Sequence, residues 1–337
     1  MQKCGDNKVC LEHGPELDTR GLFNQRMAVL SELKYPTTRL AKVLSGLFAL
    51  ALFGFVAVST VSGFLLYQVL RPARTPTSFD LTVMMGHPMT LSFSLDDGTS
   101  REGWFFPGLR GAPTVIVAHG YRSQRADVLT LVTALQEQQF NVFLFDFAGH
   151  GTSTGVTTLG YKETGELRSA MQSISTRDDV DPKRFGLWGM DMGGYVTLEV
   201  ATSDPRVAAF SVDDAYADPR EMVQLQVRKS GLTALPGVAL FSDIGFRLLN
   251  YSFRNEPPVS QRLGRTSGIP KLFIESDDRP ELADATVKLF SQAPDPKQLV
   301  RHRQNYSDMS DDDRKMYESQ IVNFFLQAIP PSSQRTH

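Results

Sequence analysis

The chain has 337 residues, of which 41% are hydrophobic, with 35 basic and 37 acidic residues. This length supports one large domain with an additional segment. The net charge of −2 lacks the basic excess typical of proteins that bind nucleic acid, so we expect no nucleic-acid partner.

Residues 1–38 form a polar segment without apolar periodicity, and we expect this segment to be disordered. It contains both cysteines of the chain, Cys4 and Cys10. The remaining residues therefore cannot form a disulfide with one another, and the spacing of this pair matches no zinc-binding pattern. We predict neither a metal site nor another cofactor.

The next segment, from Val43 to Tyr67, is an uncharged run of 25 residues. As a helix it would be about 37 Å long, more than the ~30 Å hydrocarbon core of a bilayer. The apolar part of a signal peptide is shorter, ~7–15 residues, and core helices of this length rarely lack a polar stripe. We therefore predict a single transmembrane helix within residues 39–70, with membrane lipid as its partner.

Basic residues flank both ends of this run, three before it and two after it: Lys34, Arg39 and Lys42, then Arg71 and Arg74. Positive charge favours the cytoplasmic side, so this slight excess places the N-terminus inside the cell. The main domain would then lie on the extracytoplasmic side. Residues 71–78 contain two prolines and are expected to form a linker.

From residue 79 the pattern changes to alternating strands and helices. A hairpin is predicted around Asp97-Gly98, followed by continuous apolar runs at 114–118, 141–147 and 207–212 that are typical of buried strands. Helical patterns separate these runs. The sequence thus predicts an α/β domain over residues 79–329, with a mostly parallel sheet and helices on both faces.

Residues 215–268 interrupt this alternation with four prolines and two predicted helices. Such an insertion between core strands would lie over the carboxyl ends of the strands, where open α/β sheets bind ligands. We expect a small helical cap, with an apolar or acyl small molecule as its ligand. The tail, residues 330–337, is expected to be disordered.

The most informative motif is Gly189-Met190-Asp191-Met192-Gly193. It follows an apolar strand and precedes a helix, which is the layout of a nucleophile elbow, Gly-x-Ser-x-Gly. Asp191 stands where this motif has its serine.

These motifs, in this order, resemble the α/β-hydrolase superfamily, and most closely its serine aminopeptidase and Bem46-type branch. The similarity covers about residues 79–329 and implies a nucleophile, an acid, a late histidine base and a backbone oxyanion hole. The residues that carry it are Asp97-Gly98 with Trp104, His119-Gly120, Asp146, Gly149-His150-Gly151, the Asp191 elbow, Asp213 and Pro270-Lys271-Leu272-Phe273-Ile274.

The resemblance assigns a role to five further positions. The oxyanion-hole donors would be the backbone N–H groups of Tyr121 and Met192. The acid would be Asp278, with Asp277 as the alternative. The histidine position in the loop before the last helix falls on Tyr306.

Serine hydrolysis needs a serine and a base that titrates near neutral pH, whereas Asp191 is a carboxylate and tyrosine titrates near ~10. The leading interpretation is therefore a membrane-anchored α/β-hydrolase-fold protein without hydrolase activity that acts as a binding or scaffold module. One alternative is an Asp191 nucleophile, as in relatives resembling haloalkane dehalogenases and epoxide hydrolases. The other is a hydrolase that uses a different base, such as His302.

Overall fold

The computed structural model describes residues 38–74 and 88–331. The predictions for residues 1–37, for the linker after Arg74 and for the tail after Pro331 lie outside the described residues. The chain divides into two compact units, residues 1–60 and 61–337.

The first unit contains most of one long helix, α2 (Arg39–Leu70), which is longer than the predicted apolar run. Its most apolar 18-residue stretch has a mean hydropathy of 2.1 and none of it is buried. That stretch is therefore not part of a buried core, and the helix is long and apolar enough to cross a membrane.

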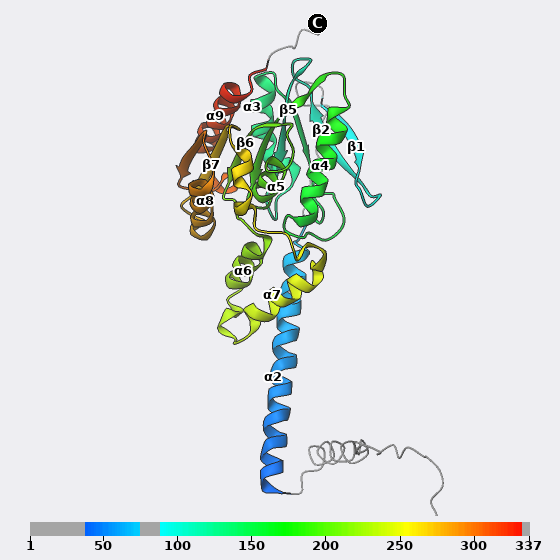
Figure 1. Ribbon diagram of the computed structural model, residues 1–337, viewed down its shortest axis with the longest axis vertical. Coiled ribbons are helices and arrows are strands. Elements are labelled where there is room, and N and C mark those ends of the chain that lie inside the picture. Colours follow the sequence, from blue (N-terminus) through cyan, green and yellow to red (C-terminus); the bar gives the residue numbers. More distant parts are fainter. Residues whose placement is uncertain (1–37, 75–87, 332–337) are drawn as a thin grey trace, which may run out of the picture. The chain divides into compact units, whose positions relative to one another are not determined.

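The second unit is built on one eight-stranded sheet with the strand order β1-β2-β4-β3-β5-β6-β7-β8 (Figure 1). The pairs β1–β2 and β2–β4 are antiparallel and all other pairs are parallel. This confirms the predicted mostly parallel α/β sheet. The strands are β1 (Met89–Ser94), β2 (Ser100–Phe106), β3 (Ala112–Ala118), β4 (Asn141–Phe145), β5 (Val180–Met190), β6 (Val207–Asp213), β7 (Lys271–Ser276) and β8 (Lys297–His302).

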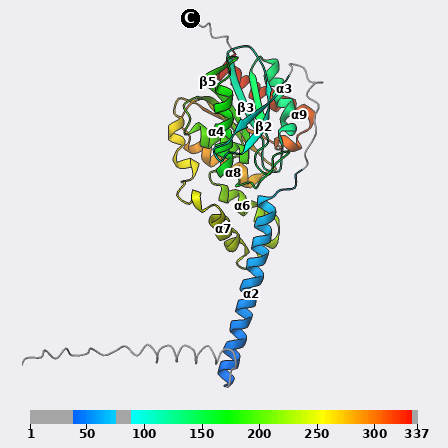
Figure 2. The ribbon, with the colours of Figure 1, turned by 90° about the vertical axis from the view of Figure 1, so that its right-hand side faces the viewer.

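Helices cover both faces of the sheet (Figure 2). On one face α3 and α9 pack together, and their apolar side chains join those of the central strands in one buried core. On the other face α4 packs against α5, the helix that follows the elbow. The helices are α3 (Leu129–Glu137), α4 (Tyr161–Ser175), α5 (Met192–Ala201), α8 (Pro280–Gln292) and α9 (Asp311–Ala328).

The predicted cap contains two helices that pack together, α6 (Pro219–Lys229) and α7 (Val238–Leu249). α7 begins at Val238, immediately after Gly237, which adopts a positive φ of 90°. The rest of the insertion consists of loops and short 3₁₀ turns.

Candidate functional site

The elbow connects the end of β5 to the start of α5 in one residue. Asp191 has φ 40° and ψ −99°, a backbone conformation that non-glycine residues rarely adopt. The neighbouring glycines are required by close packing: a Cβ at Gly189 would lie 2.1 Å from the carbonyl oxygen of Gly193, and one at Gly193 would lie 2.2 Å from that of Ala118. The strained turn of a nucleophile elbow is therefore present, with a carboxylate at its apex.

The side chain of Asp191 occupies the position expected for an oxyanion. Its Oδ1 accepts the backbone N–H of Tyr121 at 2.6 Å and also the backbone N–H of Met192. These are the two donors that the family resemblance assigns to the oxyanion hole. Asp191 is only 3% exposed, so its own carboxylate fills this hole.

The other carboxylate oxygen is held by an arginine that the sequence analysis did not identify. Oδ2 of Asp191 lies 3.2 Å from Nη1 of Arg279, whose side chain is 22% exposed. Nη2 of Arg279 donates to Oδ1 of Asn305 at 2.9 Å. A signal was present in the sequence, because Arg279 directly follows the acidic pair Asp277-Asp278 at the predicted acid position.

Asp278 lies where the predicted acid would contact the loop after β8. The carboxylate of Asp278 accepts two hydrogen bonds from Asn305, one from the backbone N–H at 3.0 Å and one from the side-chain Nδ2 at 2.8 Å. Asp277 instead points outward, 55% exposed, and pairs with Arg301 at 3.5 Å. The four side chains Asp191, Arg279, Asn305 and Asp278 thus form one continuous polar chain.

Tyr306, predicted at the histidine position, has another environment. It is 1% exposed, and its hydroxyl donates to Glu318 of α9 at 2.7 Å and lies 3.0 Å from Oγ1 of Thr130 in α3. Its ring packs edge-on against Trp188. The structure therefore brings Asn305, one residue earlier, to the acid, and places Tyr306 in the core between α3 and α9.

Two further acids lie behind the elbow. Oδ2 of Asp213 accepts the hydroxyl of Tyr317 at 2.8 Å, while its buried Oδ1 has no hydrogen-bond partner within the described residues. Asp214 accepts the backbone N–H of Ser276 at 3.0 Å and also its hydroxyl. Burial, together with the neighbouring charge of Asp214, raises the pKa of Asp213.

Burial also raises the pKa of Asp191, and the charge of Arg279 and the two backbone N–H groups oppose that effect. For Arg279, burial acts to lower the pKa, but the carboxylates of Asp191 and Asp214 hold the pKa above its usual value. Arg279 is thus the counter-ion of a cluster of buried acids.

The three histidines of the described part of the chain do not bond to Asp191. His119 accepts the backbone N–H of Phe147 at 3.0 Å, and its Nδ1 donates to the carbonyl of Gly120 at 2.8 Å. His150 donates to the carbonyl of Ala148, and His302 to Gln320 of α9 at 3.2 Å. Within residues 38–74 and 88–331 no group of three or more His, Cys, Asp or Glu side chains could hold a metal ion.

The last turn of α2 covers the loop that donates to Asp191. The hydroxyl of Tyr121 donates to the carbonyl of Val69 at 2.8 Å. The backbone N–H of Thr157 donates to the carbonyl of Leu70 at 3.1 Å. A cavity of about 180 Å³ lies beside this turn, lined by side chains from α2, the loop and α6: Leu65, Gln68, Val69, Arg122, Gln226, Val227, Lys229 and Ser230.

Comparison with known proteins identifies a family for this arrangement. Residues 115–322 match the model of the alpha/beta hydrolase family. The uncharacterized protein YfhR of Escherichia coli (strain K12) is 30% identical over 260 residues, which cover 72% of this chain and 82% of YfhR. The polyketide transferase grgF of a Penicillium species is 31% identical over 123 residues, 35% of this chain and 42% of that protein.

Solved structures share the fold at low sequence identity. The esterase Pf2001 of Pyrococcus furiosus superposes with a TM-score of 0.62 and 19% identity, covering 77% of this chain and 100% of that chain. The alpha/beta hydrolase GrgF superposes with a TM-score of 0.57 and 20% identity, covering 72% and 99%.

Proposed function

The chain belongs to the alpha/beta hydrolase family, and we propose that it acts there as a membrane-anchored, non-catalytic scaffold. The observation that carries this proposal is the occupied oxyanion hole: both backbone donors, Tyr121 and Met192, bind the carboxylate of Asp191. In an acyl-transfer enzyme these donors bind the oxygen on which negative charge develops. Here a fixed side chain already uses them.

The electrostatics argue against acyl transfer in a second way. A substrate oxyanion in this hole would have to displace the carboxylate of Asp191 or lie against it, and two like charges at contact distance repel strongly. The elbow also offers no hydroxyl to attack a carbonyl carbon. The nucleophile of a serine hydrolase is therefore missing, and the backbone donors that would stabilise its oxyanion are occupied by Asp191.

An Asp191 nucleophile is not favoured by the geometry. Such a residue needs one free oxygen and a base that activates water for the second step. Oδ2 of Asp191 is paired with Arg279, and the side chain next to Asp278 is the amide of Asn305, which cannot accept a proton near neutral pH. His302, the other alternative base, is bonded to Gln320 instead.

The cavity beside the cap does not favour a small-molecule ligand at that place. Its volume of about 180 Å³ is below the ~300–1,000 Å³ of ordinary ligand pockets.

Anchoring is the second part of the proposal. α2 would span the bilayer through the segment from Val43 to Tyr67, with the hydrolase-like domain on the extracytoplasmic side. Mass spectrometry of the protein isolated from membranes tests this. An intact N-terminal part containing α2 is the expected result, and a chain that begins after residue 70 would show that the segment is a cleaved signal sequence.

Activity is tested with the full chain and its Asp191→Asn variant, which keeps an oxygen acceptor for Tyr121 and Met192 but removes the charge. We expect both proteins to hydrolyse a panel of p-nitrophenyl esters at the same background rate. Faster turnover by the wild type, or labelling of any serine by a fluorophosphonate, would overturn the proposal. With epoxide or haloalkane substrates in ¹⁸O water, incorporation of label into Asp191 would instead establish a carboxylate nucleophile.

A further inference from the structure

We propose that the cap is a second membrane contact, in which the apolar face of α7 lies in the interfacial layer of an anionic bilayer. This inference rests on the proposed anchor. It adds a surface, a partner chemistry and an orientation of the domain that the anchor alone does not give.

α7 has two opposite faces of different character. Val238, Ser242 and Phe246 are buried against the rest of the domain. On the solvent side Leu240, Ile244 and Leu248 are 59%, 40% and 68% exposed. These three residues are spaced four apart and so form one apolar line along the helix.

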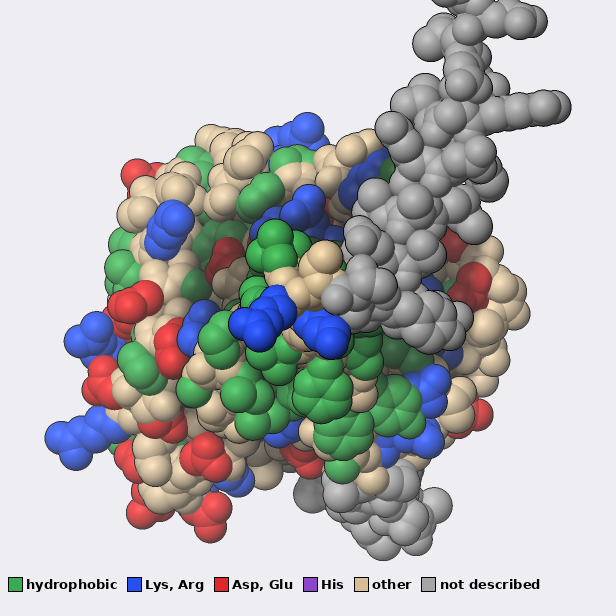
Figure 3. Space-filling model, turned by 90° about the horizontal axis from the view of Figure 1, so that it is seen from below, with side chains coloured by type: hydrophobic (Ala, Val, Ile, Leu, Met, Phe, Trp, Pro, Cys, Tyr) green, Lys and Arg blue, Asp and Glu red, His purple; other side chains and the backbone are tan. Residues whose placement is uncertain are grey.

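The exposed apolar surface continues beyond this line. Leu249 and Tyr251 are 68% and 59% exposed at the end of the helix, and Leu235 is 45% exposed in the loop before it. Single exposed apolar residues are ordinary on a protein surface, but a contiguous group marks an interaction site. In the view from below, which also includes α2, apolar and basic side chains gather at the centre and acidic side chains lie mainly toward the margin (Figure 3).

The charges around α7 suit anionic headgroups. Between residues 228 and 254 the only acid is Asp243, which is 17% exposed and pairs with Arg220 at 3.0 Å and with Arg247 at 4.0 Å. The basic residues of the same stretch are Arg228, Lys229, Arg247 and Arg254. Helices that lie in a membrane interface combine an apolar face with basic flanks in this way.

Contacts with α2 argue for lipid as the occupant. Oγ of Ser62 donates to the carbonyl of Val238 at 3.1 Å, and Leu66 packs so closely on Gly245 that a Cβ there would lie 3.1 Å from it. Ser62 and Leu66 both lie within the uncharged run Val43–Tyr67, near its carboxyl end. Chain connectivity therefore brings α7 to the end of the proposed membrane segment.

A second copy of the chain fits this surface less well. An α7–α7 contact would bring four basic residues and one paired acid from each copy face to face, and like charges at an interface cost affinity. Anionic lipid neutralises the same charges, so we commit to a lipid surface.

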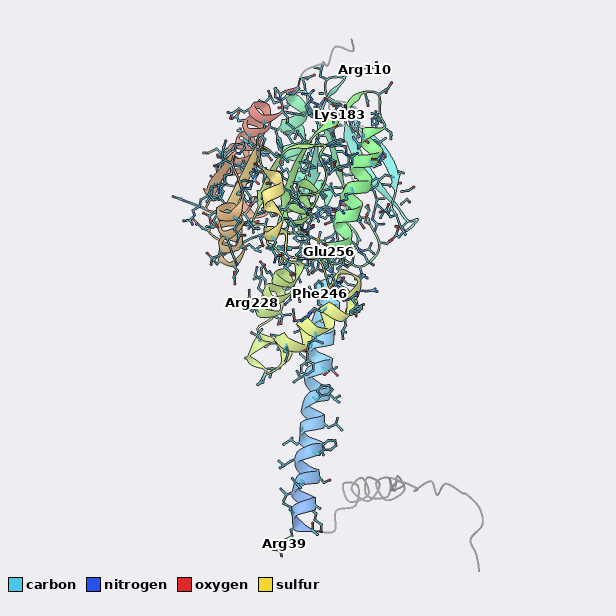
Figure 4. All side chains as sticks on the ribbon, viewed as in Figure 1. Arg39, Arg110, Lys183, Arg228, Phe246 and Glu256 are labelled. Atoms are coloured by element: carbon cyan, nitrogen blue, oxygen red, sulfur yellow. The ribbon has the colours of Figure 1, made fainter. Side chains whose placement is uncertain are left out.

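The test measures the depth of a tryptophan in the full chain, reconstituted in vesicles of phosphatidylcholine and phosphatidylglycerol. Leu248→Trp places the probe on the apolar line. Lys183→Trp places a control at the end of the domain opposite Phe246 (Figure 4). The native Trp104 and Trp188 are 5% and 0% exposed and give the same background in both variants.

Brominated lipid should quench about half of the emission added by Leu248→Trp, because an interfacial helix inserts its apolar face by ~5–10 Å. Lys183→Trp should lose almost none. Leu240→Trp provides a second probe on the same line if Leu248→Trp lowers the melting temperature. Quenching should also fall when phosphatidylglycerol is omitted.

Two readouts separate this inference from the anchor. The protein could float with the vesicles while Leu248→Trp and Leu240→Trp are quenched no more than Lys183→Trp. That result would overturn the cap contact but not the proposed anchor. Protein that does not float with the vesicles would overturn both. Cross-linking of α7 to α7 without quenching would identify the surface as an interface between copies, against the proposal.

Discussion

Oδ1 of Asp191 accepts the backbone N–H of Tyr121 at 2.6 Å, across 70 residues of sequence. The contact joins the elbow after β5 to the loop after β3 through the donor that a hydrolase keeps free for its substrate. With Met192 as the second donor and Arg279 as the counter-ion, the side chain of Asp191 is a fixed part of the fold.

Gly120→Ala should destabilise the protein because of this carboxylate. A Cβ at residue 120 would lie 2.8 Å from Oδ2 of Asp191, which is held in place on both oxygens. Overpacking of this kind costs about 1–3 kcal/mol. In an Asp191→Ala background the same substitution should cost clearly less, as measured by urea unfolding of all four proteins. If Gly120→Ala lowers the free energy of unfolding equally in both backgrounds, the carboxylate of Asp191 is not held in a fixed position.

Arg279→Met should leave the charge of Asp191 buried without its counter-ion. Breaking a buried pair costs about 3–5 kcal/mol, and we expect about 2–3 kcal/mol because Arg279 is partly exposed. Without Arg279 the pKa of Asp191 rises further above its usual value. The folded state then holds a proton that the unfolded state has released, so the loss should be larger at pH 8 than at pH 5.

Arg301→Met is the matched control for that experiment. Arg301 also pairs with a carboxylate, Glu275, at 2.9 Å, but its side chain is 65% exposed. An exposed pair contributes about 0–1 kcal/mol. If Arg279→Met is no more costly than Arg301→Met, or has no pH dependence, Arg279 is not the counter-ion of the buried acids.

Acid should destabilise the fold through His150. Burial lowers the pKa of His150 to about 3. The unfolded chain takes up a proton near pH ~6.5, and the folded chain does not until about pH 3. The free energy of unfolding should therefore fall as the pH drops below ~6.5, by about 1.4 kcal/mol per pH unit. In His150→Gln the decline between pH 7 and pH 5 should be smaller by about 2 kcal/mol.

His302→Gln serves as the comparison, since His302 is half-buried on β8 and hydrogen-bonded to Gln320. Its removal should change the pH profile less than the removal of His150. An unchanged slope in His150→Gln, by denaturant unfolding at each pH, would exclude this histidine as the source of acid lability.

Restoring a triad should succeed at residue 305 and fail at residue 306. With Asp191→Ser and Arg279→Met in place, Asn305→His puts an imidazole next to Asp278, and ester hydrolysis should rise above background. Tyr306→His should instead lose stability, because Tyr306 is 1% exposed and bonded to Glu318. Activity in the Tyr306→His protein and none in the Asn305→His protein would contradict this geometry.

Local sequence patterns were sufficient to predict the sheet and the elbow. Strand and helix periodicity is local, so the elements from β1 to α9 could be placed within a few residues. Glycine is needed at residues 189 and 193 because the backbone passes close to them. This requirement depends on the turn and not on the side chain at residue 191. Tyr121 and Met192 could be identified as donors for the same reason, since backbone N–H groups follow from the path of the chain.

The side chains that meet at the site follow from tertiary packing. Whether Asn305 or Tyr306 faces Asp278 depends on the packing of Tyr306 against Thr130 and Glu318, which lie 188 residues apart. The pairing of Arg279 with Asp191 likewise spans 88 residues. No local pattern encodes these distances, because the direction of a loop side chain is set by the helices that pack over it.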